Sequence, residues 1–157
     1  MSVYKIERIQ TLPISLEKAW HFFSSPENLN AITPDDMHFE ITSGNEKEPM
    51  HAGQIITYKV SPLLGIKMFW MTEITHVQDK AFFVDEQRFG PYAFWHHRHY
   101  FREVEGGVEM RDIVYYKLPL GILGTLAHAV FVRKKLEQIF NYRFTKLESL
   151  FGKTKNA

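Results

Sequence analysis

Alternating side chains near the amino terminus predict a strand followed by two short helices. Residues 3–11 alternate in character in the way that the two faces of a strand require. Ser15 is suited to be the N-cap of a short helix, and Ser25 followed by Pro26 gives the same signal for a second helix. The second helix is expected to end before Pro34. Two short helices therefore interrupt a chain that is otherwise rich in strands.

Six further extended segments follow, separated by turn residues. They are residues 37–42, 53–60, 66–77, 81–88, 93–104 and 108–117. The pairs Gly90-Pro91 and Gly106-Gly107 are typical of the turns between them. These connections are too short for helical crossovers, so we expect antiparallel hairpins.

After Pro119 the spacing of the apolar residues changes from two to three and four. Leu126, Phe140, Phe144 and Phe151 belong to this stripe, while Lys134 lies on the opposite side. Such a pattern is typical of a long amphipathic helix.

The order of elements predicts an α+β fold. A curved antiparallel sheet of seven strands has one apolar face to cover, and the terminal helix is the one predicted element long enough to cover it. Strong curvature of the sheet around this helix would leave a cavity between the two.

Composition narrows the classes of function. A chain of 157 residues with 45% hydrophobic and 24% charged residues suits a folded protein with one core. The net charge of +1 gives no electrostatic reason to expect nucleic acid. The absence of cysteine excludes disulfides, thiolate metal sites and a cysteine nucleophile, and it agrees with a cytoplasmic location. Residues 122–132 form the longest apolar run, which is too short for an integral membrane segment.

The register of the last two strands decides which polar side chains face inward. A two-residue turn at Gly106-Gly107 would place His99 opposite Val114 and His97 opposite Tyr116. The other face of this hairpin carries three arginines and a glutamate, so it is assigned to solvent. The inward face then carries Trp95, His97, His99, Phe101, Met110, Asp112, Val114 and Tyr116.

In this register, Asp112 lies diagonally from His99, within reach of its imidazole. Two interpretations stay open: the polar residues satisfy one another in a core, or they line a cavity and orient a ligand. Trp70 and Tyr58 would add aromatic rings to the wall of this cavity, because each alternates in step with apolar residues of its own strand and so shares their face. An aromatic content of 15% favours the cavity, because so many rings pack poorly between one sheet face and one helix without a void.

Metal binding and acid–base catalysis are alternative uses of the same residues. His97, His99 and Glu103 have the spacing of one cupin metal motif, but Gly90 lies one residue too early for that motif and no second histidine motif follows. We therefore expect no metal and no other cofactor. The sequence shows no nucleophile motif and no phosphate-binding loop. Acid–base work by His99 with Asp112 stays open.

Several short segments form a recognisable set: Pro26-Glu27-Asn28-Leu29, Ile32-Thr33-Pro34, Phe83-Val84-Asp85 with Gln87, Gly90-Pro91, Trp95-x-His97-x-His99-x-Phe101, and Asp112 with Tyr116 and Leu118-Pro119. This set resembles the START-like superfamily, also called SRPBCC or birch-pollen-allergen-like, and in particular small bacterial polyketide-cyclase/dehydrase-like and cell-division-inhibitor-like proteins. The resemblance implies a helix-grip fold, in which the sheet grips the terminal helix around a pocket for hydrophobic ligands. It implies that Asp85 and Gln87 face this pocket, and that residues 1–157 form a single START-like ligand-binding domain.

Three functions follow as hypotheses. The preferred one is binding of a small hydrophobic or aromatic molecule, similar to a lipid or polyketide, between sheet and helix. The second is a cyclase or dehydratase that uses His97, His99 and Asp112 as acids and bases. The third is a transient membrane contact or a protein partner, including a homodimer, through apolar residues at 61–65 and 120–132. The expected ligand-binding residues are Tyr58, Trp70, Asp85, Gln87, Trp95, His97, His99, Phe101, Asp112, Val114 and Tyr116.

Overall fold

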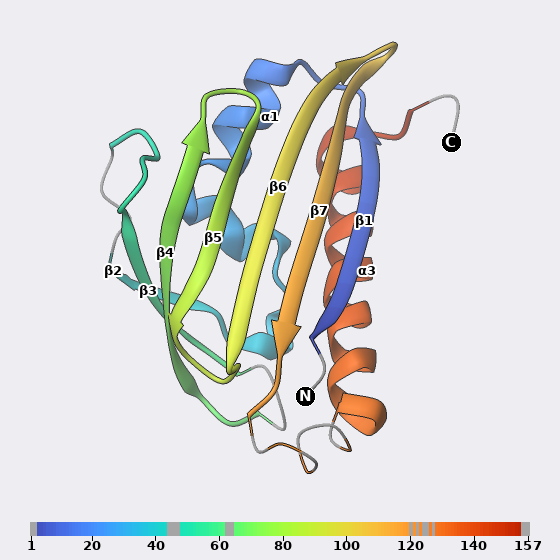
Figure 1. Ribbon diagram of the computed structural model, residues 1–157. Helices are drawn as coiled ribbons and strands as arrows, with labels where there is room; N and C mark the ends of the chain where they lie inside the picture. The colour runs from blue at the N-terminus through green and yellow to red at the C-terminus, as the bar shows by residue number, and fades with distance from the viewer. Residues whose placement is uncertain are drawn as a thin grey trace.

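One antiparallel sheet and a long helix on its inner face make up most of the structure (Figure 1). The computed structural model describes residues 3–43, 48–61, 65–119, 121, 123, 126 and 128–154. The strands are β1 (Tyr4–Leu12), β2 (Glu40–Ser43), β3 (Ile55–Val60), β4 (Met68–Gln78), β5 (Phe82–Phe89), β6 (Phe94–Val104) and β7 (Gly107–Lys117). The helices are α1 (Leu16–Phe23), the 3₁₀ turns η1 (Pro26–Ile32) and η2 (Asp35–Met37), the π turn η3 (His128–Val132) and α3 (Arg133–Phe151).

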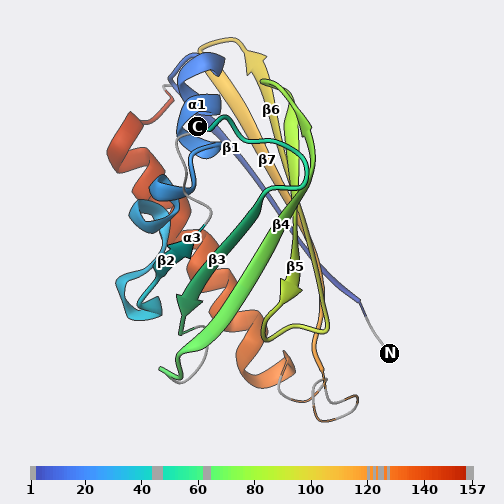
Figure 2. The same cartoon turned by 90° about the vertical axis from the view of Figure 1, so that its left-hand side faces the viewer.

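The strands are ordered β1-β7-β6-β5-β4-β3-β2, and all neighbours are antiparallel. Figure 2 shows that α1, η1 and α3 lie on the same side of the twisted sheet. Helix α3 packs against that side through Leu136, Phe140 and Leu147, which are all buried. Gln10 Nε2 of β1 also donates to the carbonyl of Phe144 at 3.0 Å, which ties the edge strand to the helix. The predicted α+β architecture with seven strands and a covering C-terminal helix is confirmed.

The two short helices form where the sequence predicts them, although the second is a 3₁₀ helix. Ser15 caps α1 by accepting a hydrogen bond from the amide of Lys18 at 3.2 Å. Ser25 makes no side-chain cap to η1, because its hydroxyl donates backward to the carbonyl of His21 at 2.7 Å. Asn28 likewise donates to the carbonyl of Phe22. Such side-chain bonds to the backbone compete with regular α-helix and favour short turns.

The β6–β7 hairpin differs from the predicted register by two residues. Val104 pairs with Gly107, so the turn is Glu105-Gly106, and His99 lies directly opposite Asp112 rather than opposite Val114. Gly107 is needed in the strand, because a Cβ atom there would lie 2.0 Å from the carbonyl oxygen of Leu12 in β1. Since side chains alternate with a period of two, a shift of two leaves the predicted faces unchanged.

The buried side chains form two clusters along the inner face of the sheet. One cluster, at the end near α1, includes Trp20 and Phe83. The other includes Trp70 and Phe140. Arginines of the predicted wet face form exposed ion pairs outside, such as Arg102 with Glu109 at 2.8 Å.

The predicted apolar stripe of the terminal helix is not buried along its whole length. Leu126 is 62% and Phe144 is 38% exposed, whereas Phe140 is buried. The π turn η3 comes before the regular helix, so a single stripe does not continue through it. Residues 62–64, 120, 122, 124, 125 and 127 of the predicted apolar contact segments lie outside the described residues. Within the described residues, no helix combines the length and apolar character that crossing a membrane requires.

Candidate functional site

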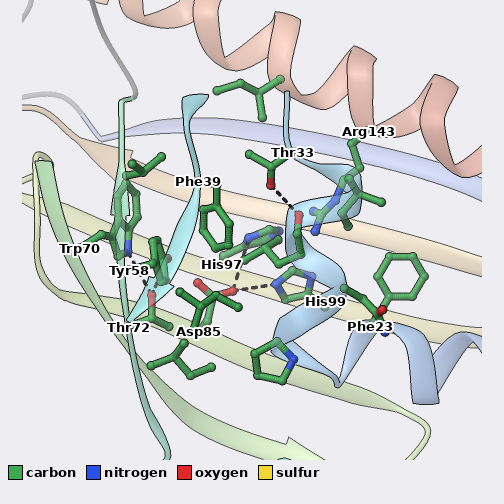
Figure 3. A pocket seen from close by; sticks show the side chains of 18 of the residues that line it. Phe23, Thr33, Phe39, Tyr58, Trp70, Thr72, Asp85, His97, His99 and Arg143 are labelled. Carbon is green, nitrogen blue, oxygen red and sulfur yellow. Dashed lines mark hydrogen bonds and ion pairs between the residues drawn. The ribbon is translucent and has the colours of Figure 1, made fainter. Parts of the chain in front are cut away.

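A cavity of about 200 Å³ lies between the inner face of the sheet and the helices. Its wall comes from β2 to β6, from α1 and η1, and from α3. Most of the lining is apolar, with rings such as Phe39, Tyr58 and Trp70 on one side (Figure 3). A deep, mostly apolar space with a few polar groups is the usual form of a site for a small molecule.

A cluster of two histidines and two aspartates lies between the two buried clusters. His99 stacks on Phe83, with ring centroids 4.1 Å apart, and His97 lies edge-on to Phe140 at 6.0 Å. The histidine and aspartate side chains are between 6% and 16% exposed. His97 and Asp85 are directly paired across β5 and β6, so regular strands hold this polar cluster.

The two aspartates lie on opposite sides of the imidazole rings. Asp85 Oδ2 is 2.7 Å from His99 Nε2 and 3.5 Å from His97 Nδ1 (Figure 3). Asp112 Oδ1 is 3.2 Å from His97 Nε2 and 2.9 Å from His99 Nδ1. The first of these Asp112 contacts has hydrogen-bond geometry, whereas the second is close enough for an ion pair but poorly aligned for a hydrogen bond. Asp85, His97 and His99 line the cavity, whereas Asp112 lies behind the rings.

Arg143 of α3 reaches the same cluster. Its Nη1 atom is 3.6 Å from Asp112 Oδ2, and its side chain is 12% exposed at the cavity wall. Burial acts to raise the pKa of Asp112, but Arg143 and the two histidines outweigh burial and hold this pKa well below its usual range. The pKa of Asp85 is also lowered, because His97 and His99 outweigh burial. Both carboxylates are therefore favoured in the ionised form.

The two histidines differ in their preferred charge. Burial acts to lower the pKa of His99, but the contacts with Asp112 and Asp85 outweigh burial and raise this pKa. Burial and the neighbouring His99 lower the pKa of His97, and the aspartates do not compensate. When the two histidines together hold one extra proton, this proton is therefore favoured on His99 rather than on His97.

A second polar group lies on the neighbouring strands β3 and β4 of the same sheet. Trp70 Nε1 donates to Thr72 Oγ1 at 3.0 Å, and the hydroxyl groups of Tyr58 and Thr72 are 2.9 Å apart. Burial raises the pKa of Tyr58, so its hydroxyl keeps its proton. This network holds the stacked rings of Tyr58 and Trp70 in place.

The predicted ligand-binding residues divide into two sets. Those in the cavity wall are Tyr58, Trp70, Asp85, Trp95, His97 and His99. Outside the wall are Gln87, Phe101, Asp112, Val114 and Tyr116. Gln87 holds the β5–β6 turn, because its amide donates to the carbonyl of Tyr92 at 2.7 Å and accepts from the amide of Tyr92 at 3.1 Å.

The other residues outside the wall support it from behind. Phe101 packs edge-on against Trp20 at 5.6 Å. Val114 lies opposite His97 in β7 and is fully buried. Tyr116 packs against Tyr92 at 5.9 Å, next to the wall. These residues fix the positions of the side chains that line the cavity.

The sequence pattern did not predict that a residue of α3, Arg143, contacts the histidine–aspartate cluster. Arg143 lies three residues after Phe140 and four before Leu147, so the spacing of the buried stripe includes it. A charged side chain is expected to face solvent, and the inward orientation of Arg143 is explained by its ion pair with Asp112. Glu103, the third residue of the cupin-like spacing, is exposed near the end of β6 and is not part of this cluster.

No family model and no curated protein matches this sequence. Solved structures match nearly the whole chain. Protein CV1439 from Chromobacterium violaceum matches with a TM-score of 0.72 at 10% identity, over 94% of this chain and 96% of that one. Major latex-like protein 151 from Panax ginseng matches with a TM-score of 0.67 at 12% identity, over 95% and 97%. Ara h 8.0201 matches with a TM-score of 0.64 at 14% identity, over 95% and 97%.

These identities are low, so the likeness concerns the fold. The chain has the helix-grip fold that the sequence resemblance implied.

Proposed function

We propose that this protein is a single-domain carrier that binds a small apolar or aromatic molecule in the cavity between sheet and α3. The observation that carries the proposal is the cavity of about 200 Å³, with an apolar wall and the Asp85–His97–His99 group on one side. Rings and aliphatic chains provide the affinity, and the polar group orients the ligand.

The volume of the cavity supports a compact ligand. An engineered apolar cavity of about 150 Å³ is known to bind benzene. The cavity here is moderately larger, at about 200 Å³. A molecule with one or two rings and one polar group fits this space better than a lipid with a long chain. We assign its polar group to the side of Asp85 and His99, and its rings to the side of Tyr58 and Trp70.

Native mass spectrometry of protein purified from its own host tests this proposal directly. An extra mass of a few hundred daltons that is lost on denaturation would support the carrier and give the class of ligand. Trp70 and Trp95 line the cavity, whereas Trp20 does not, so ligand binding should also change tryptophan fluorescence. A Trp20→Phe variant should keep this change, while Ile139→Phe, which fills the cavity wall from α3, should lose it. Binding that is equal in Ile139→Phe and wild type would argue against this cavity.

Acid–base catalysis of the cyclase or dehydratase type is the second candidate. The placement of His99 between Asp85 and Asp112 at the cavity wall favours it, because a carboxylate can orient an imidazole that faces a bound substrate. Replacing His99 with Ala should then abolish turnover of a polyketide-like substrate while ligand binding persists. Activity that survives this change would exclude the role.

A contact surface is the third candidate. Leu123, Leu126, Val130 and Phe131, which precede α3 in the chain, are each more than half exposed. Exposed apolar residues in such number favour contact with a membrane surface during ligand delivery by a cytoplasmic protein. Co-sedimentation with lipid vesicles tests this contact, and a dimer in sedimentation analysis without vesicle binding would assign the surface to a second copy instead.

A further inference from the structure

Three potential metal ligands converge on the cavity side of the histidine–aspartate cluster. Asp85, His97 and His99 each offer one ligand atom, and these atoms lie within 4.8 Å of one another. Asp85 Oδ2 is 3.5 Å from His97 Nδ1 and 2.7 Å from His99 Nε2. Ligand atoms that bind one ion tetrahedrally with bonds of about 2.0–2.2 Å lie about 3.3–3.6 Å apart, so only small side-chain movements would be needed.

The other nitrogen of each ring faces one carboxylate. Asp112 Oδ1 lies 3.2 Å from His97 Nε2, where it can accept this N–H, and 2.9 Å from His99 Nδ1, where the two atoms are close but poorly aligned for a hydrogen bond. A neutral imidazole carries a single N–H, so His97, with its Nε2–H directed at Asp112, would carry a lone pair on Nδ1, on the Asp85 side. His99 Nε2 can donate to Asp85 Oδ2 at 2.7 Å, and a metal ion would take the place of this proton.

Asp112 has the position of an outer carboxylate in a metal site. Metal-binding histidines usually donate their second N–H to a carboxylate, which fixes the tautomer and the ring orientation. Arg143 Nη1, at 3.6 Å from Asp112 Oδ2, favours the charged form of this carboxylate. Asp112 itself does not line the cavity.

We propose that Asp85, His97 and His99 bind a divalent first-row transition-metal ion at the cavity wall. Two imidazole nitrogens and one carboxylate oxygen are ligands that suit Zn²⁺, Co²⁺ and Fe²⁺. The two aspartates and Arg143 leave one negative charge in the cluster when both histidines are neutral, which favours a cation. The three ligands face the cavity, so a water molecule or a polar atom of the bound molecule would complete the coordination. This inference goes beyond the carrier function and does not depend on it.

The site differs from the cupin-like spacing of the sequence. That spacing uses Glu103, which is exposed at the end of β6. The carboxylate of the proposed site comes instead from β5, where Asp85 pairs with His97. The third ligand therefore comes from the neighbouring strand and was not visible in the spacing of one segment.

The test titrates the full chain, stripped with a chelator, with Co²⁺ while the visible absorption is recorded. We expect one Co²⁺ per chain, with absorption bands that Zn²⁺ abolishes by displacement. His97→Ala and Asp85→Asn should each weaken Co²⁺ binding at least tenfold, and Asp112→Asn should weaken it between about tenfold and 100-fold, as is typical of outer-shell changes.

A matched control lies on the opposite face of the same two strands. His96 Nδ1 and Glu86 Oε1 form a pair at 2.7 Å on the outer face of the sheet. His96→Ala should leave Co²⁺ binding unchanged. A loss in His96→Ala as large as in His97→Ala, or retention of the full affinity in Asp85→Asn, would overturn the proposal.

The wild type alone decides the outcome if the variants do not fold. In the Co²⁺ protein, a hyperfine-shifted exchangeable imidazole proton should appear in the NMR spectrum, from the His97 N–H that Asp112 holds. A wild-type chain that takes up no Co²⁺ would show that the cluster holds a proton in place of a metal, and Co²⁺ binding without this resonance would show that the ion is not bound by His97.

Discussion

At the scale of single residues, Asp112 is a buried carboxylate that depends on several partners in the candidate site. Its side chain is 10% exposed and contacts His97, His99 and Arg143. A buried charge is tolerated only when paired charges and hydrogen bonds compensate for the lost hydration. Asp112 therefore has a structural role in holding the rings, whichever ligand the cavity takes.

Replacing Asp112 with Asn should destabilise the protein by about 3 kcal/mol, because Arg143 would keep a buried charge without a partner. The free energy of unfolding in urea measures this change, in protein stripped of metal. Glu86→Gln is the matched control, because Glu86 makes the comparable pair with His96 on the outer face, and it should cost less than about 1 kcal/mol. Equal losses in the two variants would show that the inner cluster is no more than a surface ion pair.

A second residue-scale prediction concerns Gly107. Its φ is 153°, and a Cβ atom on this residue would lie 2.0 Å from the Leu12 oxygen, so there is no room for a side chain. Gly107→Ala should therefore separate β1 from β7 and lower the midpoint of thermal unfolding far more than Gly106→Ala. Gly106 also has a positive φ, of 83°, but a Cβ atom there would meet nothing within 4 Å. Similar midpoints for the two variants would contradict the close approach of β1.

At the scale of elements, the strands were predictable because side-chain alternation and turn residues agree. The predicted inner and outer faces of β6 and β7 are correct although the predicted turn is wrong, because the register differs by an even number of residues. The strand β5 was different. Asp85, Glu86 and Gln87 are polar on both parities, and the pairing with β4 contains two irregularities, so only the family resemblance placed Asp85 inside. Arg143 was missed because a charged residue on a buried stripe is explained only by a partner distant in the sequence.

The packing of α3 gives a prediction at this scale. Phe140 is 6% exposed against the sheet, whereas Phe144, one turn later, is 38% exposed. Phe140→Ala should destabilise the protein by about 3–5 kcal/mol, because it removes buried contacts and enlarges the cavity. Phe144→Ala should cost clearly less, and denaturant unfolding of the two variants measures the difference. The same loss at both positions would mean that the two rings contribute equally to the packing of α3.

At the scale of the whole molecule, the cavity depends on the distance between α3 and the curved sheet. Sequence periodicity identifies the faces of both elements, but the volume between them depends on how the side chains interlock. An aromatic content of 15% indicated that a void is expected, and the structure gives it a volume of about 200 Å³. The wall joins residues from the amino-terminal helices, the strands β2 to β6 and the C-terminal helix, so occupation of the cavity should stabilise the molecule as a whole.

A bound ligand should therefore raise the midpoint of thermal unfolding. A compound present at about 100 times its Kd stabilises the folded state by about 2.7 kcal/mol, if it does not bind the unfolded chain. For a chain of this length, that gain corresponds to an upward shift of roughly 5–10 °C. Scanning calorimetry with one-ring and two-ring aromatic compounds measures the shift. Ile139→Phe should keep the midpoint of the free protein within a few degrees and should lose the shift, because the new ring occupies the space of the ligand. A shift of the same size in wild type and Ile139→Phe would place the ligand outside this cavity, and α3 would then act only as the cover of the sheet.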